Sequence, residues 1–253
     1  MTEYSRYEIT VRSSVDGSEE PSLFFPAEGS APRPLLVGLH TWSYNRFNQI
    51  NNMLPYARQH NFHLLLPEFR GSNTPGNERC RQACGSPIAV RDILDAIEAV
   101  KGLAPVDESS ILLLGASGGG HMALMTAATA PRLFRAVGSF VPITDLAAWY
   151  KENSNYAGSV LACCETEEEM ARRSPIHLAE ALAGVRLKIF HGKSDPVVPY
   201  THSVNMFLKI METDPGAGVY LDIFDGGHEM RMPMAMDWLL SQMSKKETNS
   251  VTG

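Results

Sequence analysis

The sequence predicts an α/β protein with a mostly parallel central sheet and helices on both faces. Apolar runs alternate with amphipathic segments along most of its 253 residues, which is the pattern of strands joined by crossover helices. Two of these runs, 35–39 and 111–114, are continuously apolar, as in central strands that are covered on both faces. The hydrophobic fraction of 44% is sufficient for one large globular core.

The first predicted strand, residues 7–12, alternates polar and apolar side chains and is assigned to a sheet edge. Further strands are predicted where apolar runs end in turn residues, at 22–25, 35–39, 62–66, 109–114, 136–141, 185–190 and 219–224. Helical periodicity predicts helices at 48–60, 89–103, 121–130, 200–211 and 232–243. The Gly-, Asn-, Pro- and Arg-rich residues 71–85 are predicted to be a loop.

Residues 142–184 interrupt this alternation. Helices are expected at 146–152 and 165–173, with a polar loop at 153–159 between them. We therefore expect one domain, 1–253, with a small cap or lid at 145–183. The polar tail 245–253 is expected to be disordered.

The most informative motif is Gly115-Ala116-Ser117-Gly118-Gly119, which directly follows the apolar run 111–114 and precedes a helical segment. A serine on a tight strand-to-helix turn points its hydroxyl away from the sheet, and small residues are needed where strand and helix pass closely. Taken alone, the motif could be a glycine-rich turn before a helix. Its context instead predicts that Ser117 is a nucleophile.

Two later segments supply partners for this serine. Asp195 follows the strand at 185–190, and His228 lies in a Gly-Gly loop after the strand at 219–224. His228 is predicted to take the proton from Ser117, with Asp195 holding the imidazole in the required tautomer. Taken singly, Asp195 could cap a helix and His228 could be a solvent-exposed loop residue. Together with Ser117, they meet at the carboxyl edge of the predicted sheet, where ligands bind in such folds.

The order Ser117, Asp195, His228 resembles that of an α/β-hydrolase. More narrowly, the chain resembles the catalytic domain of prolyl oligopeptidase-type serine hydrolases and related esterases. The similarity covers about residues 20–244, and the matching motifs are Leu39-His40-Thr41-Trp42, Pro67-Glu68-Phe69-Arg70-Gly71-Ser72, Gly-Ala-Ser-Gly-Gly-Gly from Gly115, His-Gly-Lys-Ser-Asp-Pro-Val-Val-Pro from His191, and Gly226-Gly227-His228. The resemblance implies a serine hydrolase that works through an acyl-enzyme.

The resemblance also implies an oxyanion hole made of backbone N–H groups. Gly118, which follows the nucleophile, is one expected donor, and Thr41 or Trp42 is the other. Family members often have glycine where this chain has Thr41, so the second donor must work without the conformational freedom of glycine.

Four further residues are candidates for substrate contact. They are His40, Trp149, Tyr150 and Tyr156. Each has an alternative: the aromatic side chains could fill the core, and His40 could brace the oxyanion loop, which is the favoured interpretation for it. Arg70 could bind a substrate carboxylate or form a structural ion pair, and the ion pair is favoured.

Composition limits the cofactors and partners. The net charge of −6 disfavours nucleic acid and anionic membranes. No apolar run has the ~20 residues of a membrane span, and the polar amino terminus lacks a signal-peptide core, which favours a cytoplasmic location. We expect no metal and no organic cofactor, since the three catalytic side chains need none, and oligomeric state is undetermined.

The four cysteines, Cys80, Cys84, Cys163 and Cys164, show no zinc-site spacing. Free thiols are favoured. The alternative is a disulfide between Cys80 or Cys84 and the 163–164 pair, which would tie the 71–85 loop to the cap.

For the reaction, the sequence favours a carboxylic ester over a peptide as substrate. Peptidases of the resembled family usually carry a large propeller domain that filters peptides, and 253 residues leave no room for one. A peptidase or amidase acting on a short peptide is the first alternative. A relative of the fold that binds a small ligand without turnover is the alternative of another class.

Overall fold

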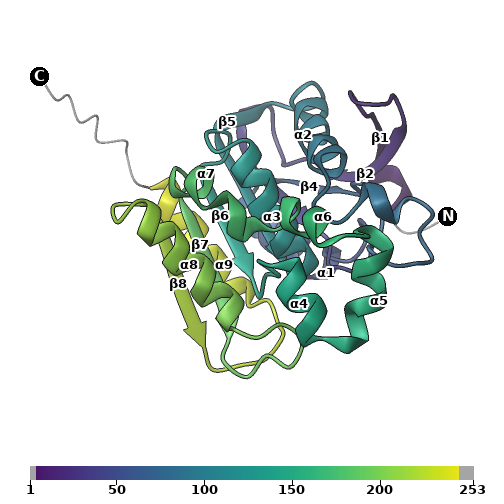
Figure 1. Ribbon diagram of the computed structural model, residues 1–253. Coiled ribbons are helices and arrows are strands. Elements are labelled where there is room, and N and C mark those ends of the chain that lie inside the picture. Colours follow the sequence, from purple (N-terminus) through teal and green to yellow (C-terminus); the bar gives the residue numbers. More distant parts are fainter. Residues whose placement is uncertain (1–3, 245–253) are drawn as a thin grey trace, which may run out of the picture.

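The computed structural model describes residues 4–244, and it contains one eight-stranded sheet in the order β1-β2-β4-β3-β5-β6-β7-β8 (Figure 1). The strands are β1 (Glu8–Arg12), β2 (Glu19–Phe25), β3 (Arg33–Leu39), β4 (His63–Pro67), β5 (Val106–Ala116), β6 (Ala136–Phe140), β7 (Leu187–Gly192) and β8 (Val219–Phe224). Only β2 runs antiparallel to its two neighbours, and all other pairs are parallel. The predicted fold class is confirmed.

The helices cover both faces of this sheet. They are α1 (Ile50–His60), α2 (Pro87–Lys101), α3 (Gly118–Thr129), α4 (Leu146–Glu152), α5 (Ser154–Cys163), α6 (Glu167–Arg172), α7 (Ala179–Ala183), α8 (Thr201–Thr213) and α9 (Met232–Met243). Three 3-10 turns accompany them: η1 (Ser5–Tyr7), η2 (Cys80–Gln82) and η3 (Pro175–Leu178). The sequence located most of these elements to within a few residues.

Each strand contributes alternate side chains to two separate cores. Leu35 and Leu113 face the layer made by α2, α3, α7 and α8. Leu36 and Leu112, their neighbours in the chain, face α1 and α9 on the opposite side. This two-sided burial explains why the central strands are continuously apolar in sequence.

The predicted cap segment consists of α4, α5, α6, η3 and α7, between β6 and β7. In Figure 1, α4 and α5 lie together at one end of the molecule. The prediction of a polar loop at 153–159 is wrong, because α5 begins at Ser154. The Asn153 side chain accepts a hydrogen bond from the Asn155 N–H at the start of this helix, and Val160 and Cys163 bury its other side. Burial of one side of this segment therefore stabilises a helix, although its polar sequence predicted a loop.

The four cysteines are free and buried. They gather in a small core with Trp42, Trp149 and further side chains of the predicted cap segment, such as Val160. The Cys80 thiol donates to the Ala162 carbonyl oxygen at 3.1 Å. Of the two sequence interpretations, the free-thiol state is the one observed.

Arg70 forms a structural ion pair, as the sequence favoured. Its side chain is 1% exposed, and its guanidinium contacts Asp92 on α2 and Asp16 in the β1–β2 turn. Glu20 lies 3.5 Å from the same guanidinium, so the positive charge lies among three carboxylates. Arg70 anchors the loop after β4, and it is not available to bind a substrate carboxylate.

The predicted tail at 245–253 lies outside the described residues. Within residues 4–244, no helix combines the length and the apolar character required to cross a membrane.

Candidate active site

Ser117 lies in the turn between β5 and α3, with φ 56° and ψ −121°. Non-glycine residues rarely adopt such a positive φ, so the surrounding structure has to hold it there. The Ser117 N–H donates to the Phe140 carbonyl oxygen at 2.9 Å. A Cβ at position 115 would lie 2.1 Å from the Gly119 carbonyl oxygen, so Gly115 permits the close approach of strand and helix. The turn therefore presents Ser117 at the amino end of α3.

Asp195 and His228 are brought together from the loops after β7 and β8. His228 Nδ1 lies 2.7 Å from Asp195 Oδ2. The other carboxylate oxygen, Oδ1, accepts from the N–H groups of Val197 and Val198 at 2.8 and 3.0 Å. Because Nδ1 faces a carboxylate, it carries a proton, which leaves Nε2 of a neutral ring without one.

The charge state of Asp195 follows from these contacts. Burial of the carboxyl group by itself raises its pKa. Hydrogen bonds from His191, His228 and the two backbone N–H groups outweigh burial and hold the pKa of Asp195 well below its usual range. Asp195 is therefore ionised at neutral pH and can stabilise an imidazolium on His228.

His191 is a contact of Asp195 that the sequence did not reveal. The ring is fully buried, and its Nε2 lies 2.9 Å from the Val198 carbonyl oxygen and 3.3 Å from Asp195 Oδ2. Its Nδ1 lies 2.6 Å from Ser203 Oγ on α8. Since Nε2 faces two acceptors, it carries the proton, and Nδ1 accepts from the Ser203 hydroxyl. The spacing of four residues between His191 and Asp195 across one turn was the available signal.

The second predicted oxyanion donor can be narrowed to Trp42. The Thr41 N–H donates to Asn48 Oδ1 at 3.1 Å, so it is already engaged. A Cβ at position 118 would lie 2.6 Å from the Trp42 nitrogen, so the Trp42 and Gly118 backbones are in close contact. In the described part of the chain, the Trp42 N–H has no acceptor. The geometry therefore favours Trp42 over Thr41 as the second donor of the predicted oxyanion hole.

One cavity of about 240 Å³ lies beside Ser117, His228 and Trp42. It is lined by Thr41, Trp42, Ser43, Tyr44, Asn48, Gln49, Asn52, Ala116, Ser117, Val141, Tyr156, His228, Glu229 and Met230. Among the described residues, no hydrogen bond joins Ser117 and His228; such bonds often tighten only when substrate binds. Glu229 is the one carboxylate in this lining, and Arg231 pairs with it at 2.7 Å. The cavity therefore favours a substrate group without net charge.

Of the four candidates for substrate contact, only Tyr156 lines this cavity. Trp149 is 1% exposed, lies edge-on to Trp42, and donates its indole N–H to the Val197 carbonyl oxygen at 2.9 Å. Tyr150 packs against the same small core. His40 is buried, stacks on Phe69 at 3.9 Å, and approaches the Glu68 carbonyl oxygen at 2.7 Å. These three side chains are outside the lining of this cavity.

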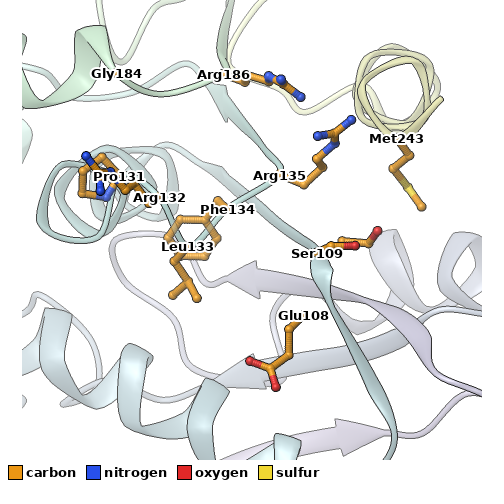
Figure 2. A pocket seen from close by; sticks show the side chains of 11 residues that line it. Glu108, Ser109, Pro131, Arg132, Leu133, Phe134, Arg135, Gly184, Arg186 and Met243 are labelled. Carbon is orange, nitrogen blue, oxygen red and sulfur yellow. The ribbon is translucent and has the colours of Figure 1, made fainter. Parts of the chain in front are cut away.

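A larger cavity of about 760 Å³ lies near the opposite ends of the strands (Figure 2). Glu108 and Ser109 lie near the start of β5, while Arg135 and Arg186 directly precede β6 and β7. None of the predicted catalytic side chains lines it. Its position at the amino ends of parallel strands is also not where such sheets bind substrates. Within residues 4–244, no group of three His, Cys, Asp or Glu side chains is arranged to hold a metal ion.

The sheet order with one antiparallel strand, the serine turn and the Asp195–His228 pair define an α/β-hydrolase of the serine hydrolase class. The sequence matches the prolyl oligopeptidase family over residues 48–244. This chain therefore belongs to the prolyl oligopeptidase family, which confirms the resemblance found in its motifs.

Individual relatives agree with this family. The sequence is 27% identical over 136 residues to acylamino-acid-releasing enzyme 1 of Oryza sativa subsp. japonica, a match that covers 52% of this chain and 18% of that protein. The fold is similar to an acylaminoacyl peptidase of Pyrococcus horikoshii, with TM-score 0.76, 20% identity, and coverage of 95% of this chain and 42% of that one. It is also similar to dipeptidyl peptidase 4 of Porphyromonas gingivalis, with TM-score 0.75, 16% identity, and coverage of 94% and 35%. The chain thus spans less than half the length of each.

His121, one turn into α3, leads to a prediction about stability. Burial of the ring lowers its pKa from 6.5 to about 4, and the nearby charge of Arg173 acts in the same direction. The unfolded chain therefore takes up a proton near pH 6.5, whereas the folded chain does so only near pH 4. Protonation favours unfolding in this window, and the free energy of unfolding should fall by about 3 kcal/mol as pH drops through it.

Urea unfolding of the wild type and of His121→Gln at pH 7.5, 6 and 5 measures this contribution. The variant should lose less stability than the wild type between the first and last pH. His177→Gln, at an exposed histidine, serves as the control and should behave as the wild type. Equal pH slopes for His121→Gln and the wild type would contradict the prediction.

Proposed function

We propose that this chain is a serine peptidase or amidase, in which Ser117 attacks the carbonyl carbon of a short peptide or an acylated amino acid. The observation that carries the proposal is the 2.7 Å contact between His228 and the buried, ionised Asp195, with Ser117 on the wall of the same cavity. The sequence alone favoured an ester. Membership in the prolyl oligopeptidase family, and the peptidase names of the relatives, support the peptide alternative better.

In the proposed reaction, His228 Nε2 removes the proton from the Ser117 hydroxyl as Oγ attacks. The carbonyl oxygen becomes an oxyanion and is stabilised by the N–H groups of Gly118 and Trp42. His228 then gives its proton to the leaving amine, and the acyl group stays on Ser117. Water, deprotonated by His228, hydrolyses the acyl-enzyme and restores the free serine.

The polar groups of this mechanism all come from the chain. Asp195 keeps the proton on Nδ1 and opposes the positive charge on His228. No step requires a metal or an organic cofactor. The cytoplasmic location and the cap role of residues 145–183 stay predictions.

A matched pair of substrates separates peptidase from esterase. The same N-acetyl-aminoacyl group is offered as an anilide and as an ester, together with dipeptidyl anilides and simple acetate and butyrate esters. Amide hydrolysis that requires Ser117 supports the proposal. Hydrolysis of esters alone, with every amide resistant, leaves the esterase interpretation in place.

Ser117→Ala should lower kcat by about 10⁴-fold or more on whichever substrate is cleaved, because the covalent step is removed. The folded state should persist, as judged by circular dichroism and by the melting transition. A phosphonate probe should label the wild type at Ser117 and leave the variant unlabelled. An unlabelled but folded wild type that hydrolyses none of the substrates would instead favour a binding protein without turnover.

Asp195→Asn should reduce kcat by about 10⁴-fold, since an amide that donates to Nδ1 favours the wrong tautomer of His228. Asp222→Asn is the matched control. Asp222 is an acidic side chain of β8, and it pairs with Lys188 at 3.1 Å. Its replacement should leave kcat near the wild-type value. Comparable losses in both variants would assign the acid role elsewhere.

The Tyr156 and Trp149 rings are in tilted contact, with their centroids 4.8 Å apart. The two residues should nevertheless respond differently to truncation. Tyr156→Ala opens the cavity wall and should change KM and the preferred acyl size, while kcat on a small acetate ester changes by less than about tenfold. Trp149→Ala should instead cost about 3–5 kcal/mol of stability, because the ring is fully buried. Melting curves and the substrate panel are measured on both. Unchanged selectivity in a folded Tyr156→Ala variant would show that the cap does not shape the site.

A further inference from the structure

The loop between β3 and α1 carries the proposed donor Trp42, and two adjacent peptide groups in it are held by hydrogen bonds. The Thr41 N–H donates to Asn48 Oδ1 at 3.1 Å. The Thr41 carbonyl oxygen lies 3.0 Å from His40 Nδ1 and accepts from the Tyr44 N–H at 3.3 Å. In a trans peptide, the carbonyl oxygen and the following N–H point in opposite directions. Fixing the Thr41 carbonyl on one side therefore directs the Trp42 N–H to the other side.

That other side is the start of α3. The Trp42 nitrogen lies where a Cβ on Gly118 would come within 2.6 Å. The Trp42 carbonyl oxygen accepts from the Asn73 N–H at 2.8 Å, and the indole ring is buried against Trp149. The residue is thus anchored at its ring and its carbonyl, while its N–H faces Gly118 and the Ser117 turn.

Asn48 lies at the end of this loop, two residues before α1, and its side chain reaches back to Thr41. A backbone N–H can only donate, so the Asn48 atom that faces Thr41 is the oxygen. The same oxygen accepts from Gln49 Nε2 at 2.9 Å, and Gln49 Oε1 accepts from Asn52 Nδ2 at 3.0 Å. Gln49 is 3% exposed. The amide chain therefore ties Thr41 to the first turn of α1.

We infer that Asn48 is a positioning residue for the oxyanion hole: its side-chain oxygen holds the Thr41 N–H, and with it the orientation of the Trp42 N–H above Ser117. The inference rests on the proposed acyl-transfer function. Thr41 and Trp42 are not glycines, and the Asn48 side chain, from the other end of the same loop, restrains the backbone in place of a special backbone conformation. Preorganised donors stabilise an oxyanion because they need no rearrangement at the moment of reaction.

Asn48 also lines the cavity, so a direct contact with bound substrate is the competing role. The two roles affect different constants. Loss of a ground-state contact raises KM, whereas loss of a preorganised donor lowers kcat with little change in KM. The affinity for a transition-state analogue should fall in parallel with kcat/KM only if the oxyanion is affected.

The test compares Asn48→Leu, which keeps the volume without the acceptor, with Asn48→Ala and with the control Asn45→Ala. Asn45 is exposed in the same turn, and its side chain accepts from the Phe47 N–H without touching Thr41. On the best substrate of the panel, both Asn48 variants should lose about 10- to 100-fold in kcat, less than the ~10²–10³ expected for removal of a donor itself. KM should change by less than about threefold, and the pH midpoint of activity should stay at the wild-type value.

Binding of a trifluoromethyl ketone, whose hemiketal oxyanion occupies the same hole, should weaken by the same factor as kcat/KM. Asn45→Ala should keep wild-type kinetics. The inference is overturned if a folded Asn48→Leu or Asn48→Ala variant keeps more than half of the wild-type kcat, if only KM changes, or if Asn45→Ala loses as much. Should one Asn48 variant not fold, the other decides. If Ser117→Ala retains activity, the proposed function fails first, and the two failures are thereby distinguished.

Discussion

The candidate site depends on one close backbone approach, in which the β5–α3 turn meets the loop after β3. Strand and helix can cross at this distance only because Gly115 has no side chain to collide with the Gly119 carbonyl. The positive φ of Ser117 is held there by a hydrogen bond to the end of β6. Gly118 in turn allows the Trp42 backbone to lie against the start of α3. A larger residue at Gly115 would collide with the start of α3, and one at Gly118 would collide with the Trp42 backbone.

Around this contact, polar groups are fixed by partners rather than by solvent. Asp195 is buried without a cation, yet four hydrogen bonds keep it ionised. His191, itself buried, is held between α8 and the turn that carries Asp195. Such a network orients His228 before any substrate arrives, which is the form of preorganisation that acyl transfer uses. Among the surrounding aromatic side chains, Trp42, Tyr44 and Tyr156 line the cavity.

Family membership favours a peptide over an ester as the proposed substrate, while the proposed chemistry stays the same. In the proposed mechanism the same three side chains would cleave an ester or an amide, and the two substrates differ in the leaving group that His228 must protonate. Chain length was an unreliable guide to the substrate. This chain matches 42% and 35% of the two structural relatives, so each relative is more than twice as long as its matched part. The cavity of about 240 Å³ is lined by a single carboxylate, Glu229, which pairs with Arg231.

The sequence by itself determined the fold class, the order of strands and helices, and the three residues proposed for catalysis. It could do so because continuous apolar runs and the Gly-x-Ser-x-Gly turn are local patterns with few structural solutions. It did not reveal that α5 is a helix, that Trp149 is buried outside the cavity lining, or that His191 contacts Asp195. The expected helix at 48–60 also concealed Asn48, which precedes α1 and reaches back to Thr41. These features come from contacts between segments far apart in the chain, where packing and hydrogen bonding override local preference, so only the tertiary structure could decide them.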